Sequence, residues 1–283
     1  MLISEKLIFV ELQKTGSTQI KSLLKKILGG ENDAKHNIPN AEQLDSGRKV
    51  VASVRDPWSW YLSLWSYGCL QKGELYERLT NEKKWRKLLE KKDDADAEAG
   101  EDDDEGGSKG RSKTLPENFT PERARTFWYT DPDNAAAFRE WLQAVLAVQP
   151  LRKVLESGYG RSPISKAGGL MTFRYFTVCT RNGENVDKSV CTMDALRKYD
   201  AANCFVSHFV RNESLPEDLI RAIEASGVAL EDEQKQAIRE ARRTNVSDRP
   251  HAPDYYYDED SIQLVARREK FLVEKFGYKN KKP

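Results

Sequence analysis

The chain has 283 residues, of which 39 % are hydrophobic and 10 % are aromatic. This length suits one large or two modest domains, and the composition supplies a full core, which excludes a wholly disordered or fibrous protein. No apolar run approaches the ~20 residues of a membrane-spanning helix, and the N-terminal residues lack a signal-peptide pattern. We therefore expect a cytoplasmic protein without a membrane span.

Charge is distributed unevenly along the chain. The formal net charge is +1, but residues 93–105 carry nine carboxylates and no lysine or arginine, so the remainder has 46 basic against 36 acidic residues. A basic body suits an anionic ligand, although surface lysines that merely balance an acidic loop give the same count. Four cysteines without CxxC spacing and three widely separated histidines predict no metal site.

Two strand-to-helix units open the chain. Residues 7–10 form an unbroken apolar run that predicts a buried strand, and apolar residues then recur at helical spacing from Ile20 to Leu28. Residues 50–54 repeat the strand pattern, after which Asp56 predicts a helix cap and Pro57 the first helical residue. Successive units of this kind indicate an α/β fold with a parallel sheet flanked by helices.

The composition changes at residues 90–118. This segment is rich in carboxylates, glycine, serine and lysine, and from 93 to 114 it has no aliphatic residue larger than alanine. Such a sequence cannot bury enough surface to offset its ordering entropy, so we predict a disordered acidic insertion within a single domain over 1–283. The later patterns predict a helix around 138–146, a hairpin turn at Asn182-Gly183, a strand at 204–209, a helix opened by Pro216, and a last helix from about 258 to 276. Within the segment 169–178, the aromatic stretch 172–176 forms either a core strand or the lining of a sugar site.

A short polar turn follows the first strand, at Lys14-Thr15-Gly16-Ser17-Thr18. A glycine turn at the start of a helix lets backbone N–H groups converge on an anion, while the hydroxyls add donors and Lys14 adds a full charge. The turn is not a Walker A loop, because its lysine precedes the glycine and no upstream glycine is present, which disfavours a nucleotide kinase. An ordinary helix-capping turn with a surface lysine is the alternative.

A second polar site follows the second strand. Arg55 lies where that strand ends, and Ser63 comes eight residues later in the predicted helix. A guanidinium is a planar fork that matches phosphate oxygens, so Arg55 and Ser63 together suit a second phosphate. In the alternative reading, Arg55 pairs with a carboxylate and Ser63 is a solvated helix residue. Two such junctions in one sheet predict a ligand with two separated phosphoryl-type groups.

The two junctions together resemble those of sulfotransferases that use 3′-phosphoadenosine 5′-phosphosulfate. In that family a PK[ST]G[ST][ST] turn binds the 5′-phosphosulfate, and R[ND]PxxxxxS binds the 3′-phosphate. Lys14 to Thr18 match the first motif, with Gln13 in place of proline, and Arg55-Asp56-Pro57 with Ser63 match the second. The resemblance implies nucleotide binding by Lys14, Thr15, Gly16, Ser17, Thr18, Arg55 and Ser63, with adenosine 3′,5′-bisphosphate as product and no metal.

A histidine between the two junctions is the expected base. Residues 35–39, KHNIP, are similar to the KTHLP segment of cytosolic sulfotransferases, which implies that His36 takes the acceptor's proton. Imidazole suits this step because its pKa lies near neutrality. The alternative is that His36 is a surface residue without a catalytic role, and a carboxylate such as Glu11 is the competing base.

The later part of the chain resembles the family more loosely. Residues 205–219 and 245–278 look like the closing segments of carbohydrate-type and bacterial sulfotransferases, and Arg242 and Arg243 lie where cytosolic members have a basic loop. The sequence thus predicts a single-domain α/β sulfotransferase with a P-loop-like parallel sheet, whose catalytic residues are Lys14 and His36. Its acceptor is a small-molecule or carbohydrate hydroxyl or amine, and no nucleic acid is involved. The alternative is a nucleotide- or polyanion-binding module without turnover.

Overall fold

The computed structural model describes residues 1–33, 37–90, 119–242 and 251–279. Within this part of the chain the strands form one mixed sheet in the order β3-β1-β2-β4-β5. Parallel pairing joins β2 (Leu7–Val10), β4 (Lys49–Val54) and β5 (His208–Arg211). The short strands β1 (Leu2–Ile3) and β3 (Glu31–Asn32) extend the β2 edge by antiparallel pairing.

Both faces of the sheet are buried, as the apolar run at 7–10 predicts. Leu7 and Phe9 of β2 pack with Ile20 and Leu24 of α1 (Ser17–Leu28) in one apolar cluster, while Ile8 and Val10 belong to the larger core on the opposite face. This alternation is the period of two that a strand imposes on its side chains. The two-sided core explains why the buried residues of β2 and β4 are apolar, apart from Ser53.

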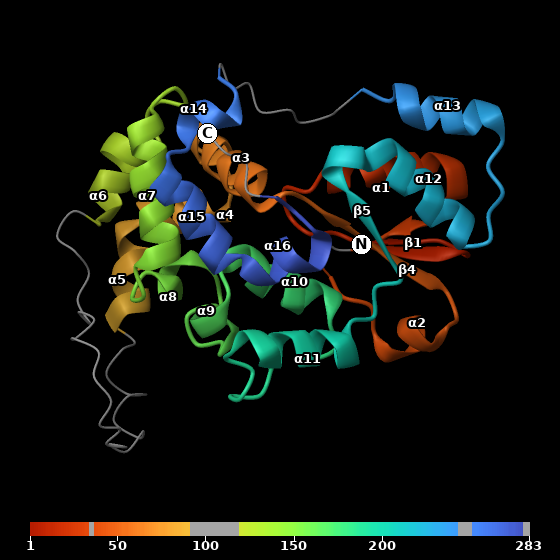
Figure 1. Cartoon of the computed structure of the whole chain (residues 1–283), viewed down its shortest axis with the longest axis horizontal. Coiled ribbons are helices and arrows are strands. Elements are labelled where there is room, and N and C mark those ends of the chain that lie inside the picture. Colours follow the sequence, from red (N-terminus) through yellow and green to blue (C-terminus); the bar gives the residue numbers. More distant parts are fainter. Residues whose placement is uncertain (34–36, 91–118, 243–250, 280–283) are drawn as a thin grey trace.

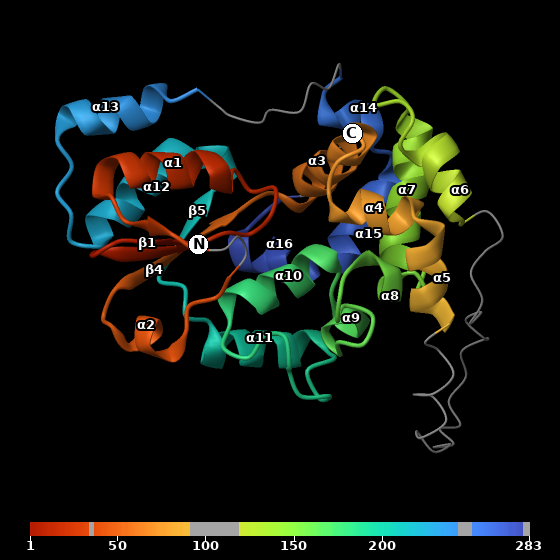
Figure 2. The same cartoon turned by 180° about the vertical axis from the view of Figure 1, so that it is seen from behind.

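Helices cover the two faces of the sheet (Figures 1 and 2). On one face lie α1 (Ser17–Leu28) and α12 (Leu215–Ala225), with α13 (Asp232–Glu240) packed against α12. On the other side lie α2 (Ala41–Asp45), α10 (Leu170–Cys179), α11 (Met193–Asn203) and α16 (Lys270–Phe276). The result is a sheet between helical layers.

A second, helical region extends from the carboxyl ends of the parallel strands (Figure 1). Its core is aromatic, with Trp65, Trp128, Trp141 and Phe138 almost fully buried. The helices of this region are α3 (Pro57–Cys69), α4 (Glu74–Thr80), α5 (Glu82–Glu90), α6 (Pro121–Arg123) with the π-helical turn Ala124–Trp128, α7 (Ala135–Ala147), α8 (Arg152–Leu155), α9 (Ile164–Ala167), α14 (Pro253–Tyr256) and α15 (Glu259–Arg268).

A buried carboxylate separates the last two helices. Glu269, fully inaccessible, lies between α15 and α16 and accepts hydrogen bonds from the Tyr61 hydroxyl, from the backbone N–H of Met171 at 3.2 Å, and from both the N–H at 2.9 Å and the hydroxyl at 2.6 Å of Thr172. Its carboxylate therefore caps α10, whose own N-cap residue, Gly169, has no side chain to do so.

Several sequence-based expectations are corrected by these elements. The sheet is mixed and not wholly parallel, because β1 and β3 pair antiparallel. The strand expected within 169–178 is a helix, α10 (Leu170–Cys179). The expected last helix is two helices divided at Glu269. The third parallel strand begins at His208 instead of Cys204, and Asn182 turns the chain at positive φ without a hairpin between named strands.

Other expectations at the local level are confirmed. Asp56 caps α3 through Ser59 N–H at 2.8 Å, with Pro57 as the first helical residue, and Pro216 lies in the first turn of α12. The predicted insertion at about 90–118 lies almost wholly outside the described residues. Among the helices that the structure describes, none has the length and apolar character needed to cross a bilayer.

Candidate functional site

The turn between β2 and α1 has a backbone that few residues other than glycine adopt. Gly16 is the N-cap of α1 at φ 82°, and Lys14 is also in the left-handed region at φ 62°. No side chain caps the start of this helix, and its first turn contains no acidic residue. The N–H groups of Ser17 and Thr18 therefore present the positive end of the helix dipole without a carboxylate beside it.

Two hydrogen bonds join this turn to the end of the neighbouring strand β4. Thr15 Oγ1 lies 2.6 Å from Ser53 Oγ and donates to the Leu12 carbonyl oxygen at 2.6 Å, with both hydroxyl residues fully buried. Arg55 donates from Nη1 to the Lys14 carbonyl oxygen at 3.1 Å. Because β2 and β4 are parallel and in register, the two predicted anion-binding junctions meet at one edge of the sheet.

One face of α3 lies against the same turn. Trp60 donates from Nε1 to the Gln13 carbonyl oxygen at 2.7 Å, and the Lys14 ammonium lies over the Tyr67 ring, 4.0 Å from its centroid. Ser63 is three residues after Trp60 and four before Tyr67, so helical spacing places it on this face between the two contacts. The structure thus brings Ser63, which is 4 % exposed, to the side of α3 that faces the turn.

The end of the third parallel strand also reaches the turn, which the sequence did not predict. A Cβ atom on Gly16 would lie 2.5 Å from Nδ2 of Asn212, the residue that follows β5. The next residue, Glu213, accepts from the Asp56 N–H at 2.9 Å. Asn212 and Glu213 are a polar pair that follows an apolar strand, and this pattern could have marked them as site residues. The expected strand ended at Phe209, however, so the sequence placed both residues in a loop.

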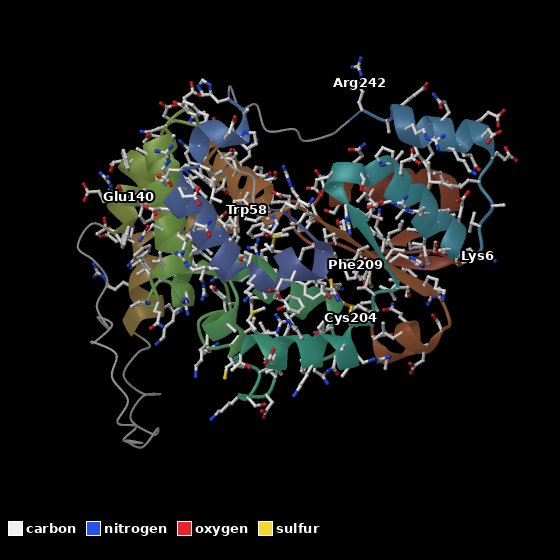
Figure 3. The ribbon with its side chains drawn as sticks, in the orientation of Figure 1. Lys6, Trp58, Glu140, Cys204, Phe209 and Arg242 are labelled. Carbon is white, nitrogen blue, oxygen red and sulfur yellow. The ribbon has the colours of Figure 1, made fainter. Side chains whose placement is uncertain are left out.

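The remaining predicted residues divide between the turn and other places. Ser17 is half-buried and Thr18 exposed, so both are open to a ligand, whereas the buried Thr15 hydroxyl is bonded to the protein. His36 lies outside the described residues. Arg242 lies just after α13, where Figure 3 shows its side chain directed away from the body, and Arg243 lies outside the described residues.

Glu11, the competing base, is held in an ion pair. Its carboxylate lies 2.7 Å from Lys21 Nζ and 2.8 Å from the Met1 amino nitrogen, and its side chain is 3 % exposed. Burial by itself raises the pKa of Glu11, but the hydrogen bonds and charges of Lys21 and the amino group outweigh burial and lower it. A carboxylate held this way is a weak proton acceptor at neutral pH.

The charges around the turn favour an anion. Lys14 and Arg55 supply two cations at the turn, while the carboxylate of Asp56 accepts from the Ser59 N–H at the cap of α3 and that of Glu213 accepts from the Asp56 N–H. No family model, curated protein or solved structure matches the chain.

Proposed function

We propose that the chain is a sulfotransferase that uses 3′-phosphoadenosine 5′-phosphosulfate. The observation that carries the proposal is the hydrogen bond from Arg55 Nη1 to the Lys14 carbonyl oxygen at 3.1 Å. Through it, two separate sequence motifs, each suited to a phosphoryl-type group, share one edge of the sheet. A ligand with two such groups accounts for both motifs.

The residues present suit this nucleotide by their chemistry. The uncapped start of α1, with Gly16, Ser17 and Thr18, supplies backbone and hydroxyl donors for the phosphosulfate. The Arg55 guanidinium and the Ser63 hydroxyl, from β4 and α3, supply the donors for the 3′-phosphate. The Thr15 hydroxyl contributes by fixing the turn to Ser53 and not by a contact with the nucleotide, because it is already bonded within the protein.

When bound, the nucleotide supplies the sulfuryl group for transfer to a hydroxyl or amine acceptor, of which a carbohydrate is one class. The Lys14 ammonium and the N–H groups of α1 hold fixed positive charge where negative charge develops during transfer, which stabilises the transition state. His36 takes the proton from the acceptor as the new bond forms. The protein acts in the cytoplasm in this proposal.

The competing function is a nucleotide- or polyanion-binding module without turnover. It uses the same Lys14 turn and the same Arg55, so binding alone does not separate the two. Release of adenosine 3′,5′-bisphosphate from the sulfate donor, measured with a panel of hydroxyl and amine acceptors, does separate them. Turnover that requires Mg²⁺ and a nucleoside triphosphate would instead favour a kinase-like enzyme.

Variants of two site residues test the proposal by calorimetry and turnover. Arg55→Ala is expected to weaken binding of adenosine 3′,5′-bisphosphate at least tenfold, because a hydrogen bond to a charged group contributes about 1.5–3 kcal/mol. Lys14→Ala is expected mainly to lower turnover, since its charge acts on the reacting group.

Arg48→Ala is the matched control for the arginine. Arg48 precedes the same strand and also donates to a backbone carbonyl, that of Ser4 at 3.2 Å, but at the opposite end of β4. It should leave nucleotide affinity unchanged. If neither Arg55→Ala nor Lys14→Ala alters binding of adenosine 3′,5′-bisphosphate, the nucleotide assignment is wrong.

A further inference from the structure

The ring of Tyr67 lies under the cation of the anion-binding turn. Lys14 Nζ is 4.0 Å from the ring centroid, within the range in which the negative face of an aromatic ring attracts an ammonium. Tyr67 is 37 % exposed, so the contact lies where a ligand can reach it. Neither polar motif includes this tyrosine, and the proposed function assigns it no role.

The turn after α3 fixes the position of the ring. The chain folds back on Tyr67, whose carbonyl oxygen accepts from the Lys72 N–H at 3.3 Å. Gly73 has φ 97°, and a Cβ atom there would lie 3.0 Å from Cδ1 of Tyr67. Glycine at 73 therefore serves two purposes. It adopts the positive φ, and it leaves the space that the Tyr67 ring occupies.

The contact places the ammonium against the face of α3 that meets the turn. Tyr67 lies one helical turn beyond Ser63 and two beyond Trp60, on the face of α3 that touches the Lys14 turn. Lys14 leaves a backbone held at φ 62°, so its direction is set at one end by the turn and at the other by the ring. A lysine without such a contact samples many rotamers, which opposes its use by a ligand.

We infer that Tyr67 is a positioning residue, which holds the Lys14 ammonium over its ring so that an anion bound at the turn meets a charge already in place. For its effect on catalysis the inference rests on the proposed function. A cation over an aromatic ring at an exposed site is stabilised by an amount that corresponds to about a two- to fivefold change in an equilibrium.

The first test needs no ligand. Lysines are dimethylated with ¹³C-formaldehyde, which keeps their positive charge, and the Lys14 signal is assigned by its loss in Lys14→Arg. We expect ring-current shielding of the Lys14 methyl groups in the wild type and in Tyr67→Phe, and its loss in Tyr67→Leu. The proton dissociation constant of dimethylated Lys14 should rise about two- to fivefold in Tyr67→Leu alone, because the ring favours the charged form.

The second test measures the consequence for the site in unmodified protein. Tyr67→Leu should weaken binding of adenosine 3′,5′-bisphosphate or lower kcat about two- to fivefold, and Tyr67→Phe should restore the wild-type value, since the ring and not the hydroxyl makes the contact. Tyr255→Leu is the matched control, because Tyr255 is 46 % exposed on α14, a helix that makes no part of the turn.

The outcomes separate this inference from the proposed function. Equal shielding of Lys14 in the wild type and Tyr67→Leu, or a Tyr67→Phe variant that behaves as Tyr67→Leu, overturns the positioning role even in an active sulfotransferase. A wild type that shows the shielding but neither binds the nucleotide nor releases it overturns the sulfotransferase, while the shielding supports the placement of Lys14 by Tyr67.

Discussion

Asn212 Nδ2 lies where a side chain at Gly16 would have to be, 2.5 Å from the position of its Cβ atom. The end of β5 thus contacts the Lys14 turn at Gly16, while the next residue, Glu213, accepts from the Asp56 N–H at the start of α3. Three successive parallel strands contribute to this one edge: β2 gives the turn, β4 gives Arg55, and β5 gives Asn212.

Gly16→Ala is expected to destabilise the fold and to disturb the turn. Alanine at φ 82° costs about 1–2 kcal/mol for the left-handed backbone alone, and the contact with Asn212 adds to this. Urea unfolding measures the total. Gly277→Ala is the matched control, because Gly277 lies in the same left-handed region, at φ 66° and ψ 30°, but has nothing within 4 Å of its Cβ position.

The difference between these two alanine variants isolates the steric contact. Adding Asn212→Ala to Gly16→Ala should recover much of that difference in stability, because it removes the Asn212 side-chain amide that the alanine Cβ atom would contact. Equal losses of stability in Gly16→Ala and Gly277→Ala would show that Asn212 moves aside without cost.

Glu269 should make stability depend on pH. Burial raises the pKa of its carboxyl above the ordinary value of 4.5, against the hydrogen bonds from Thr172 and Tyr61 that lower it. Above the ordinary pKa and below the raised one, the folded chain binds a proton that the unfolded chain has released, so the free energy of unfolding falls as pH rises through this window.

Comparison with Glu269→Gln tests this pH dependence. Urea unfolding between pH 4.5 and neutrality should show that the wild type exceeds the variant in free energy of unfolding by less as the pH rises, because the glutamine side chain has no proton to bind. The variant should be less stable throughout by about 1–3 kcal/mol, since its amide N–H₂ group faces donors and leaves one unsatisfied. The exposed Glu259→Gln is the control, and a wild-type advantage that is constant with pH would contradict the expectation.

His36 and Glu11 should respond differently to substitution. If His36 is the base, His36→Ala should lower turnover by roughly 10² or more, with little change in nucleotide affinity. Its pH–rate profile should lose the limb near the imidazole pKa of about 6.5.

Glu11→Gln should instead lower stability by about 3–5 kcal/mol, because it removes one partner of a buried ion pair with Lys21. It should keep the pH–rate limb. A Glu11→Gln variant that is fully stable but loses this limb would move the role of base to the carboxylate.

Deletion of residues 93–113 should leave the melting temperature within a few degrees. The elements on either side, α5 and α6, contact each other, and Trp85 and Phe119 are buried at 6 % and 8 % exposure. The two ends of the deletion are thus already anchored in the helical region. Calorimetric melting measures the effect. Trp85→Ala, which is expected to lower the free energy of unfolding by about 3–5 kcal/mol, shows how the melting temperature responds when a core residue is truncated. A collapse of folding on deletion would mean that the segment is a structural element.

Local signals predicted β2, β4 and the start of α3, because each depends on residues adjacent in sequence: an apolar run for the strands, and Asp56-Pro57 for the helix. The apolar pattern at 169–178 indicated a strand in place of a helix because α10 is buried on nearly all sides. Because the helix has no polar face, its sequence lacks the alternation of apolar and polar residues with a period of about 3.6. An apolar run of this length is then typical of a strand.

Long-range contacts explain what the sequence left out of the site. The motifs located Lys14, Arg55 and Ser63, since each motif is contiguous. Asn212 approaches Gly16 only because of the register of β5 on β4, with Arg211 opposite Val54. Tyr67 approaches Lys14 only because α3 returns past the turn. Neither approach has a counterpart in local sequence.

The carboxylate that caps α10 lies 97 residues beyond Thr172, one of the residues that it binds. A ribosome therefore completes α10 long before it adds Glu269. Until then the first N–H groups of this apolar helix have only water as a partner, and its surface has no finished site in which to pack. A nascent chain should thus expose an unpacked α10 while the 97 residues from Thr172 to Glu269 are added, and it should bind chaperones during that interval.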